Sequence, residues 1–367
     1  MKENYKIGII GATGMVGQRF ITLLHDHPWF QIEVLAASPR SAGKKYAEAV
    51  GAKWAMSEDI PASVADMIVM DATADVEKIA GMVDFVFCAV DMKKDEIKAL
   101  EERYAKAECP VVSNNSAHRH TPDVPMIIPE INPQHLEIIP AQRERLGTKR
   151  GFVAVKSNCS LQSYLPALAV VNEKYPVDRA IVTTYQAISG AGKTFETWPE
   201  MVDNLIPYIG GEEQKSEVEP NKILGHIEGG KIVPSEELQI ECQTYRVPVS
   251  DGHTAAIFFS FKDGVEKPSV EEIEKMWAEF EGEPQRLGLP HAPKQFIHVV
   301  TENDNPDQPQ IKSAREVDGG MAISCGRLRT SVQYDYKLVS MSHNTLRGAA
   351  GGGVLLAELL AAKGYMD

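Results

Sequence analysis

The sequence predicts an α/β protein in which a doubly wound, Rossmann-type parallel sheet is followed by an α+β domain with a mixed sheet. The chain has 367 residues, which allows about two domains of ordinary size. In the first half, short apolar strands alternate with helical patterns, as is typical of a parallel sheet. From about residue 155, longer segments alternate between polar and apolar residues, which indicates half-exposed strands.

The first half begins with a strand, a glycine turn and a helix. Apolar residues 5–10 form the strand, Gly11, Gly14 and Gly17 form the turn, and residues 18–24 continue as an amphipathic helix. Later elements alternate in the same way, with strands expected at residues 31–37, 67–71, 84–90 and 110–113 and the clearest helix at residues 93–107.

The second half has the pattern of a mixed sheet with a returning helix. Residues 238–247 and 254–261 alternate at period two, and a capping box at Ser269 and Glu272 starts a helix. The C-terminal helix contains Gly351–Gly353, and because each glycine costs a helix about 1 kcal/mol, such a run indicates close packing. We therefore expect domains at residues 1–157 and 158–343, with residues 344–367 packing back on the first.

Composition and charge exclude several classes of protein. With 38 Lys and Arg against 51 Asp and Glu, the net charge of −13 argues against a nucleic-acid-binding face. No apolar run reaches the length of about 18 residues that suggests a membrane span. The five cysteines are odd in number and scattered, which fits a reducing compartment, so we expect a cytoplasmic protein with no membrane partner.

The glycine turn predicts a phosphate cradle. A strand, Gly-x-x-Gly-x-x-Gly and a helix N-terminus offer backbone N–H groups and close approach to a dinucleotide, although the standard spacing is Gly-x-Gly-x-x-Gly. The second strand ends without the carboxylate that holds the ribose of NAD. Ser38, Arg40 and Ser41 stand there instead, and these groups suit a 2′-phosphate, so NADP is the expected cofactor.

One cysteine is a candidate nucleophile. Cys159 follows an apolar run and precedes a helix expected near residue 161, whose N–H groups would lower the pKa of the thiol and hold an oxyanion. His253 is the preferred proton-transfer partner. If Asp251 and Gly252 formed a two-residue hairpin loop, Arg246, Ser250 and His253 would share a face, although Pro248 weakens that interpretation.

Two other motifs suggest different chemistry. Residues 189–194 (Ser-Gly-Ala-Gly-Lys-Thr) resemble a P-loop, but the pattern needs glycine where Ala187 stands. The pairs His25/His27 and His118/His120 could suggest a metal, but neither has a third ligand at a matching spacing, so no metal is expected.

These features together resemble the aspartate-β-semialdehyde dehydrogenase family. The resemblance rests on Ser-Asn-Cys-Ser at residues 157–160, on residues 185–193, on Arg246 and His253 seven positions apart, and on residues 344–348; residues 38–44 look like the archaeal and fungal branch. It implies the NADPH-dependent reductive dephosphorylation of L-aspartyl-4-phosphate to aspartate semialdehyde, in lysine, methionine and threonine biosynthesis. It also implies that residues 1–157 bind NADP and that residues 158–343 serve catalysis and dimerisation.

The resemblance assigns a role to each matching residue. Cys159 would form the acyl-thioester, His253 would be the general acid/base, Gln186 would orient the substrate and Arg246 would bind its α-carboxylate. Glu212, with Glu213 as a competitor, would hold the ammonium, and Arg119 and Lys215 would hold the phosphate. The cofactor residues would be Gly11, Thr13, Gly14, Met15, Val16, Ser38, Arg40, Ser41, Ser189, Gly190 and Asn344.

Other functions stay open at this point. A malonyl-CoA reductase shares the thioester chemistry but has little use for an ammonium-binding carboxylate, and glyceraldehyde-phosphate dehydrogenase has a comparable Cys–His pair in a longer motif. An NADP-sensing regulator or a P-loop-type nucleotide-binding protein are the remaining alternatives. Long alternating strands are suited to an interface between the sheets of two copies of the chain, so we expect a homodimer or a homotetramer.

Overall fold

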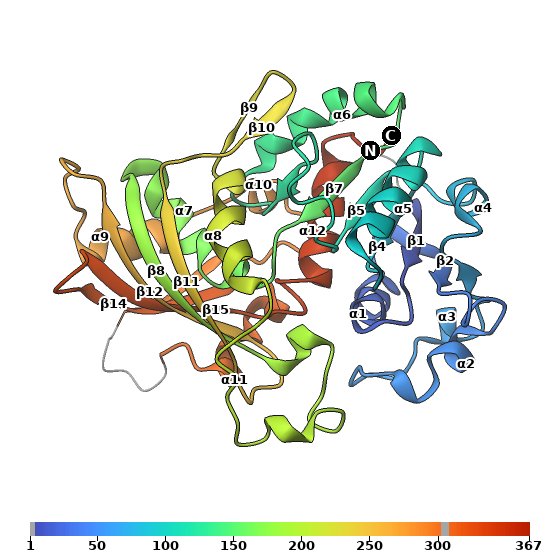
Figure 1. The fold of residues 1–367 in the computed structure, drawn as a ribbon, viewed down its shortest axis with the longest axis horizontal. Coiled ribbons are helices and arrows are strands. Elements are labelled where there is room, and N and C mark those ends of the chain that lie inside the picture. Colours follow the sequence, from blue (N-terminus) through green and yellow to red (C-terminus); the bar gives the residue numbers. More distant parts are fainter. Residues whose placement is uncertain (1–3, 302–307) are drawn as a thin grey trace.

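Two sheets organise the chain in this computed structural model, which describes residues 4–301 and 308–367 (Figure 1). The first is a seven-stranded parallel sheet of order β3-β2-β1-β4-β5-β7-β6, and the second is a six-stranded mixed sheet of order β11-β8-β12-β15-β14-β13. The expected fold class, a Rossmann-type sheet followed by a mixed sheet, is confirmed. Within the described residues, none of the helices combines the length and the apolar character that crossing a membrane would require.

The strands of the first sheet are short and buried on both faces, because helices cover each side of it. Every side chain of β4 (Phe85–Cys88) is buried, as a strand between two helical layers requires. The other strands are β1 (Tyr5–Ile10), β2 (Phe30–Ala37), β3 (Met70–Asp71), β5 (Val111–Ser113), β6 (Met126–Ile127) and β7 (Val153–Lys156). The helices are α1 (Met15–Leu24), α2 (Tyr46–Val50), α3 (Ala62–Ala65), α4 (Val76–Ala80), α5 (Lys94–Lys106) and α6 (Ile139–Leu146).

Most strands of the second sheet are longer, and β8, β11 and β12 largely alternate between buried residues and partly or fully exposed ones. Its strands are β8 (Val177–Gln186), β11 (Gln239–Arg246), β12 (His253–Phe261), β13 (Ile297–Val300), β14 (Ile323–Thr330) and β15 (Tyr336–Ser342). A separate hairpin pairs β9 (His226–Glu228) with β10 (Lys231–Val233). The helices are α7 (Leu165–Lys174), α8 (Glu212–Ile223), α9 (Val270–Glu279), α10 (Glu283–Arg286) and α11 (Ile311–Ala314).

One expectation about this sheet is wrong. Asp251 and Gly252 do not close a hairpin between neighbouring strands, because β8 lies between β11 and β12 and pairs with both. The segment after Arg246 therefore crosses over the end of β8. Two strand spacings are about 10 Å, which the residues between Arg246 and His253 easily span.

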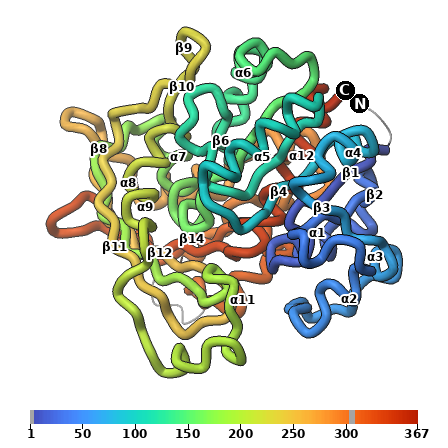
Figure 2. The backbone as a smooth tube through the Cα atoms, turned by 45° about the vertical axis from the view of Figure 1, so that its right-hand side comes forward, coloured from blue at the N-terminus to red at the C-terminus, as the bar shows by residue number. Residues whose placement is uncertain are grey.

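The C-terminal helix α12 (Ala350–Ala362) packs back on the first sheet, beside α1, β5 and β7 (Figures 1 and 2). All but its last residue are buried. Its glycines allow this approach: a Cβ on Gly353 would lie 3.0 Å from the Phe20 ring and 3.1 Å from Asn114 Oδ1. The first strand also meets the C-terminal residue, since the Tyr5 hydroxyl donates to the Asp367 carboxylate at 2.8 Å.

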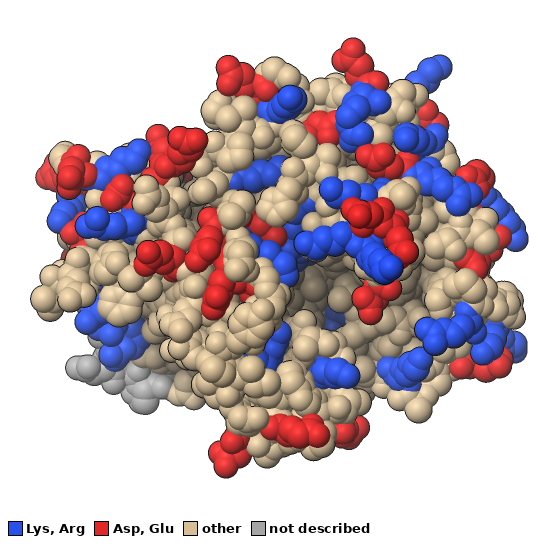
Figure 3. Space-filling model, viewed as in Figure 1, with Lys and Arg blue, Asp and Glu red and all other residues tan. Residues whose placement is uncertain are grey.

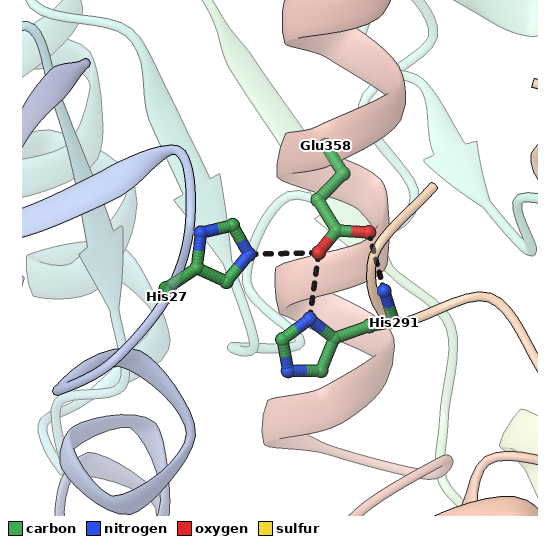
Figure 4. A group of neighbouring side chains, drawn as sticks. All are labelled: His27, His291 and Glu358. Carbon is green, nitrogen blue, oxygen red and sulfur yellow. Dashed lines mark hydrogen bonds and ion pairs between the residues drawn. The ribbon is translucent and has the colours of Figure 1, made fainter. Parts of the chain in front are cut away.

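A buried carboxylate on α12 joins three distant segments (Figure 4). Glu358 accepts hydrogen bonds from His27 Nε2 at 2.8 Å and from His291 Nδ1 at 2.6 Å, and its second oxygen accepts the His291 backbone N–H. His27 Nδ1 accepts the backbone N–H groups of Trp29 and Phe30, so the proton of the neutral ring sits on Nε2 and faces Glu358. A metal ion would need that nitrogen deprotonated, so hydrogen bonding accounts for the group better than metal binding does.

Candidate active site

Three polar side chains lie in one row across the second sheet. Gln186 at the end of β8 is the register partner of Arg246 on β11 and of His253 on β12. Residues opposite each other on neighbouring strands have side chains on the same face about 5 Å apart. All three are buried, so the register of the sheet brings together residues that are up to 67 positions apart in sequence. Ser250, by contrast, is exposed and accepts a hydrogen bond from Arg315.

Cys159 lies opposite this row, in the loop that follows β7. Its Sγ is 3.5 Å from His253 Nε2. The Asn158 side chain shapes the loop, because its carbonyl oxygen accepts both the backbone N–H and the hydroxyl of Ser160 at 2.7 Å. The loop continues into a short 3₁₀ turn, and α7 begins only at Leu165.

The charge environment of the thiol differs from the expectation. Burial raises the pKa of Cys159, with a further contribution from Glu212, and the cations Lys156, Arg119 and Arg246 only partly offset it. The expected lowering by a helix N-terminus is wrong, because α7 starts too far along the chain. Thiolate formation therefore depends on the side-chain cations around the sulfur.

The position of the proton on His253 is set by the backbone. Its Nδ1 accepts the Ala187 N–H at 3.1 Å, which leaves the proton of the neutral ring on Nε2, facing Cys159. Burial and then Arg246 lower the pKa of His253 to about 3. The ring is thus neutral near pH 7 and offers a hydrogen-bond donor to the sulfur.

Glu212 is the carboxylate that faces this group. It accepts from the Asn158 amide at 3.0 and 3.1 Å and from Lys215 Nζ at 2.5 Å. Burial opposes its ionisation, but Lys215 and the Asn158 hydrogen bond outweigh burial and hold its pKa below the ordinary value. Glu213 instead accepts the backbone N–H of Thr244 on β11, a contact within the fold. The two glutamates therefore face different surroundings, and Glu212 is the one whose carboxylate lies beside Asn158 and Lys215.

Asn158, Cys159 and Lys215 of this group border a cavity of about 300 Å³ between the two domains. Arg119, which pairs with Glu219 at 3.0 Å, lines it together with Lys215 and Cys159. Figure 3 shows this face of the molecule hollowed between the domains, with Lys and Arg side chains gathered around the hollow. Although the whole chain is acidic, the walls of the cavity carry cations suited to an anionic ligand.

The predicted nicotinamide-side residues line the same cavity. Asn344 Nδ2 donates to the Ser189 hydroxyl at 2.9 Å, and its Oδ1 accepts the Gly252 N–H at 2.8 Å. Gly190 packs closely against the Arg246 side chain: a Cβ added to Gly190 would lie 2.8 Å from Arg246 Nη1. Val16, near the start of α1, also borders the cavity, so the beginning of the helix after the glycine turn and the cysteine face one space.

A second cavity of about 400 Å³ lies along the glycine turn. Gly11, Thr13, Gly14 and Ser38 line it, as expected for a dinucleotide site at the carboxyl edge of a parallel sheet. A Cβ on Gly17 would lie 2.2 Å from the Gly11 carbonyl oxygen, so only glycine allows this tight turn. The residues therefore fit a bound dinucleotide. Met15, Arg40 and Ser41 do not line either cavity, and the Arg40 side chain is exposed.

Several lining residues were not predicted. The second cavity also includes Ala72, Thr73, Val90, Asp91 and Met92, which follow β3 and β4. The first includes Asn114, which follows β5, and Lys156 at the end of β7. These residues could have been predicted from their position at or just after the ends of parallel strands, because the carboxyl ends of such strands meet at one edge of the sheet.

The P-loop interpretation of residues 189–194 is wrong. They form a 3₁₀ turn at Ile188–Ala191, and the next α-helix begins only at Glu212. A P-loop needs a helix directly after it to direct N–H groups at phosphates. Lys193 is exposed rather than turned into a phosphate cradle.

The chain is similar to known proteins over almost its whole length. Residues 6–139 match the semialdehyde dehydrogenase NAD-binding domain, and residues 168–347 match the semialdehyde dehydrogenase dimerisation domain. The chain is 41% identical to aspartate-semialdehyde dehydrogenase of Candida albicans over 98% of both proteins. It is 42% identical to that of Saccharomyces cerevisiae over 97% of both, and 40% identical to that of Methanothermobacter thermautotrophicus over 96% of this chain and 98% of the relative.

Solved structures give the same result. The crystal structure of the Candida albicans enzyme with NADP superimposes with a TM-score of 0.87 at 39% identity, covering 98% of this chain and 99% of that one. A Vibrio cholerae aspartate semialdehyde dehydrogenase II shares the fold at a TM-score of 0.74 and 23% identity, over 99% of this chain and 100% of that one. The chain therefore belongs to the aspartate-semialdehyde dehydrogenase family.

Proposed function

We propose that this enzyme reduces L-aspartyl-4-phosphate with NADPH, giving L-aspartate-4-semialdehyde and inorganic phosphate, in the biosynthesis of aspartate-derived amino acids. The observation that carries the proposal is the Cys159–His253 pair, with 3.5 Å between Sγ and Nε2, beside a cavity with cations on its walls. The names of the fungal and archaeal relatives support the same reaction. They lend no support to a malonyl-CoA reductase-like activity.

The substrate has three charged ends, and the surrounding residues offer a partner for each. Arg246 suits the α-carboxylate, because a guanidinium can donate two parallel hydrogen bonds to it. Glu212 suits the ammonium, and Gln186 beside it orients the same end. Arg119 and Lys215 suit the phosphate.

The chemistry follows from Cys159. Its thiolate attacks the acyl carbon, the bond from that carbon to the phosphate oxygen breaks, and phosphate leaves, so that a thioester forms on Sγ. NADPH, when bound, supplies the hydride that reduces the acyl group. His253 Nε2–H then donates a hydrogen bond to the departing sulfur, while Arg246 and Glu212 hold the rest of the substrate in place.

We propose that the glycine turn holds NADP, with Gly11, Thr13, Gly14 and the adjoining Met15 and Val16 around the pyrophosphate. Ser38, Arg40 and Ser41 would hold the 2′-phosphate. The fit of the glycine turn to a dinucleotide supports this, as does the related Candida albicans enzyme, whose crystal structure contains NADP. Ser189, Gly190 and Asn344 would border the nicotinamide, because they line the cavity of Cys159.

The test is NADPH formation from aspartate semialdehyde, NADP⁺ and inorganic phosphate. We expect activity that depends on phosphate and is lost in Cys159→Ser, while NADP⁺ still binds that variant. Malonyl-CoA with NADPH is the competing assay. Turnover with malonyl-CoA alone, or normal turnover by Cys159→Ser, would contradict the proposed reaction or its covalent step.

We propose a homodimer or a dimer of dimers in the cytoplasm. The match to a dimerisation domain supports association, and five free cysteines suit a reducing compartment. Light scattering on the purified protein measures the assembly, and a monomer at micromolar concentration would contradict it. Cell fractionation tests the compartment.

A further inference from the structure

Lys156 is a buried cation near the thiol that has no role in substrate or cofactor binding in the assignments above. It is the last residue of β7, three positions before Cys159, and its side chain is only 3% exposed. It lines the cavity that also contains Cys159, Arg119 and Lys215. Gly352 of α12 lies beside this side chain, since a Cβ added there would be in ordinary contact with Lys156 Cε at 3.9 Å.

Lys222, a buried lysine with a structural role, differs from Lys156 in the number of its hydrogen-bond acceptors. Lys222 is also buried, and its ammonium donates to the backbone carbonyls of Arg119, Thr121 and Val124 at 2.7–2.8 Å. Those three acceptors use all its protons. Within the part of the chain that the structure describes, Lys156 has a single acceptor, the Ser157 carbonyl, and no ion-pair partner.

Among the described residues, the charged groups near Lys156 are paired with one another and leave its ammonium without a counter-ion. The nearby Arg119 is already paired with Glu219, whose second oxygen accepts the Asn158 N–H at 3.0 Å. The nearby Arg347 is paired with buried Glu130. Burial, and then Arg119, lower the pKa of Lys156 to about 7. An anion entering the cavity would offset both effects and restore the full charge.

We propose that Lys156 binds the phosphoryl group as a third cation beside Arg119 and Lys215, and that it holds inorganic phosphate in the reverse reaction. This inference rests on the proposed function, because it needs a phosphate at Cys159. Aspartyl phosphate and free phosphate share the relevant chemistry, a tetrahedral dianion with several acceptor oxygens. Phosphate binding should then draw a proton onto Lys156 above pH 7.

The experiment uses the full-length enzyme loaded with NADP⁺ and inorganic phosphate as the probe. In Lys156→Met we expect the KM for phosphate to rise about tenfold or more at pH 7, while the KM values for aspartate semialdehyde and NADP⁺ change less than about twofold. Calorimetry in buffers of different ionisation enthalpy should show fewer protons taken up per phosphate bound than in the wild type.

Lys222→Met is the matched control, because it removes a buried ammonium whose pKa is also about 7 but which does not line the cavity. We expect it to lower the melting temperature and to leave proton uptake on phosphate binding unchanged. If Lys156→Met fails to bind NADP⁺, Lys156→Gln takes its place in the same assays.

An unchanged KM for phosphate, or unchanged proton uptake, in a folded Lys156 variant would overturn the inference. If only the pH profile of Cys159 alkylation by iodoacetamide shifted upward, Lys156 would act on the thiol and the phosphate role would be wrong. The proposed function fails separately, if the wild type itself forms no NADPH from aspartate semialdehyde and phosphate.

Discussion

Replacing Gly190 with alanine should displace Arg246 and reduce catalysis without unfolding the protein. The new Cβ would lie 2.8 Å from Arg246 Nη1 and 3.2 Å from His253 Cε1. Ordinary van der Waals contact begins at 3.4 Å, so the guanidinium must move about 0.6 Å. It is not free to do so without cost, because Nη1 donates to the Ala187 carbonyl at 2.6 Å.

The magnitude follows from that displacement. A misplacement of about 1 Å in a binding group can cost about 100-fold in rate, so a shift of about half that size should cost about 10- to 100-fold in kcat/KM. This corresponds to about 1.4–2.7 kcal/mol of transition-state stabilisation. Because Arg246 holds the α-carboxylate in our proposal, most of the loss should be a higher KM for aspartate semialdehyde.

The assay is steady-state NADPH formation with Gly190→Ala and Gly210→Ala side by side. Gly210 is the control, since the nearest atom to its added Cβ is the Tyr208 hydroxyl at 3.8 Å. Urea unfolding should show both variants within about 1 kcal/mol of the wild type. A Gly190→Ala enzyme with the kcat/KM of the control would refute the close packing at Arg246 or its role.

The remaining predictions concern stability and the cofactor. Glu358→Gln should lower the free energy of unfolding by about 1–3 kcal/mol, measured in urea, because one amide cannot accept all the hydrogen bonds from His27 and His291; unchanged stability would contradict the joining role of Glu358. In the wild type, the free energy of unfolding should fall as the pH drops below about 6.5. Burial lowers the pKa of folded His27, despite the opposing effect of Glu358, so the unfolded chain binds the proton more strongly. Urea titrations at pH 7.5 and 5.5 measure this difference, and a higher free energy of unfolding at pH 5.5 would contradict the prediction. Arg40→Ala should reduce the preference for NADP⁺ over NAD⁺ about tenfold, through the KM for NADP⁺; an equal effect on both cofactors would mean that Arg40 does not contact the 2′-phosphate.

Local patterns were enough to predict the class of the first sheet, five of its seven strands and the likeness to the family, but not β6 and β7. Alternating strands and helices, and glycines that permit a tight turn, depend on residues close together in sequence. The same local logic failed at Asp251 and Gly252. Their turn chemistry is the same whether the flanking strands pair with each other or, as here, with β8 between them.

The sequence by itself determined which chemical groups the site has: a single cysteine in a Ser-Asn-Cys-Ser loop, a histidine and arginine seven positions apart, and a glycine turn after the first strand. Only the tertiary structure decided which of them meet. The row of Arg246, Gln186 and His253 comes from strand register, and the choice of Glu212 over Glu213 comes from the face that α8 turns to Asn158. Lys156 and Glu358 acquire their surroundings in the same way. Burial and pairing arise from contacts between residues far apart in the chain, and those contacts set the charge state of each group.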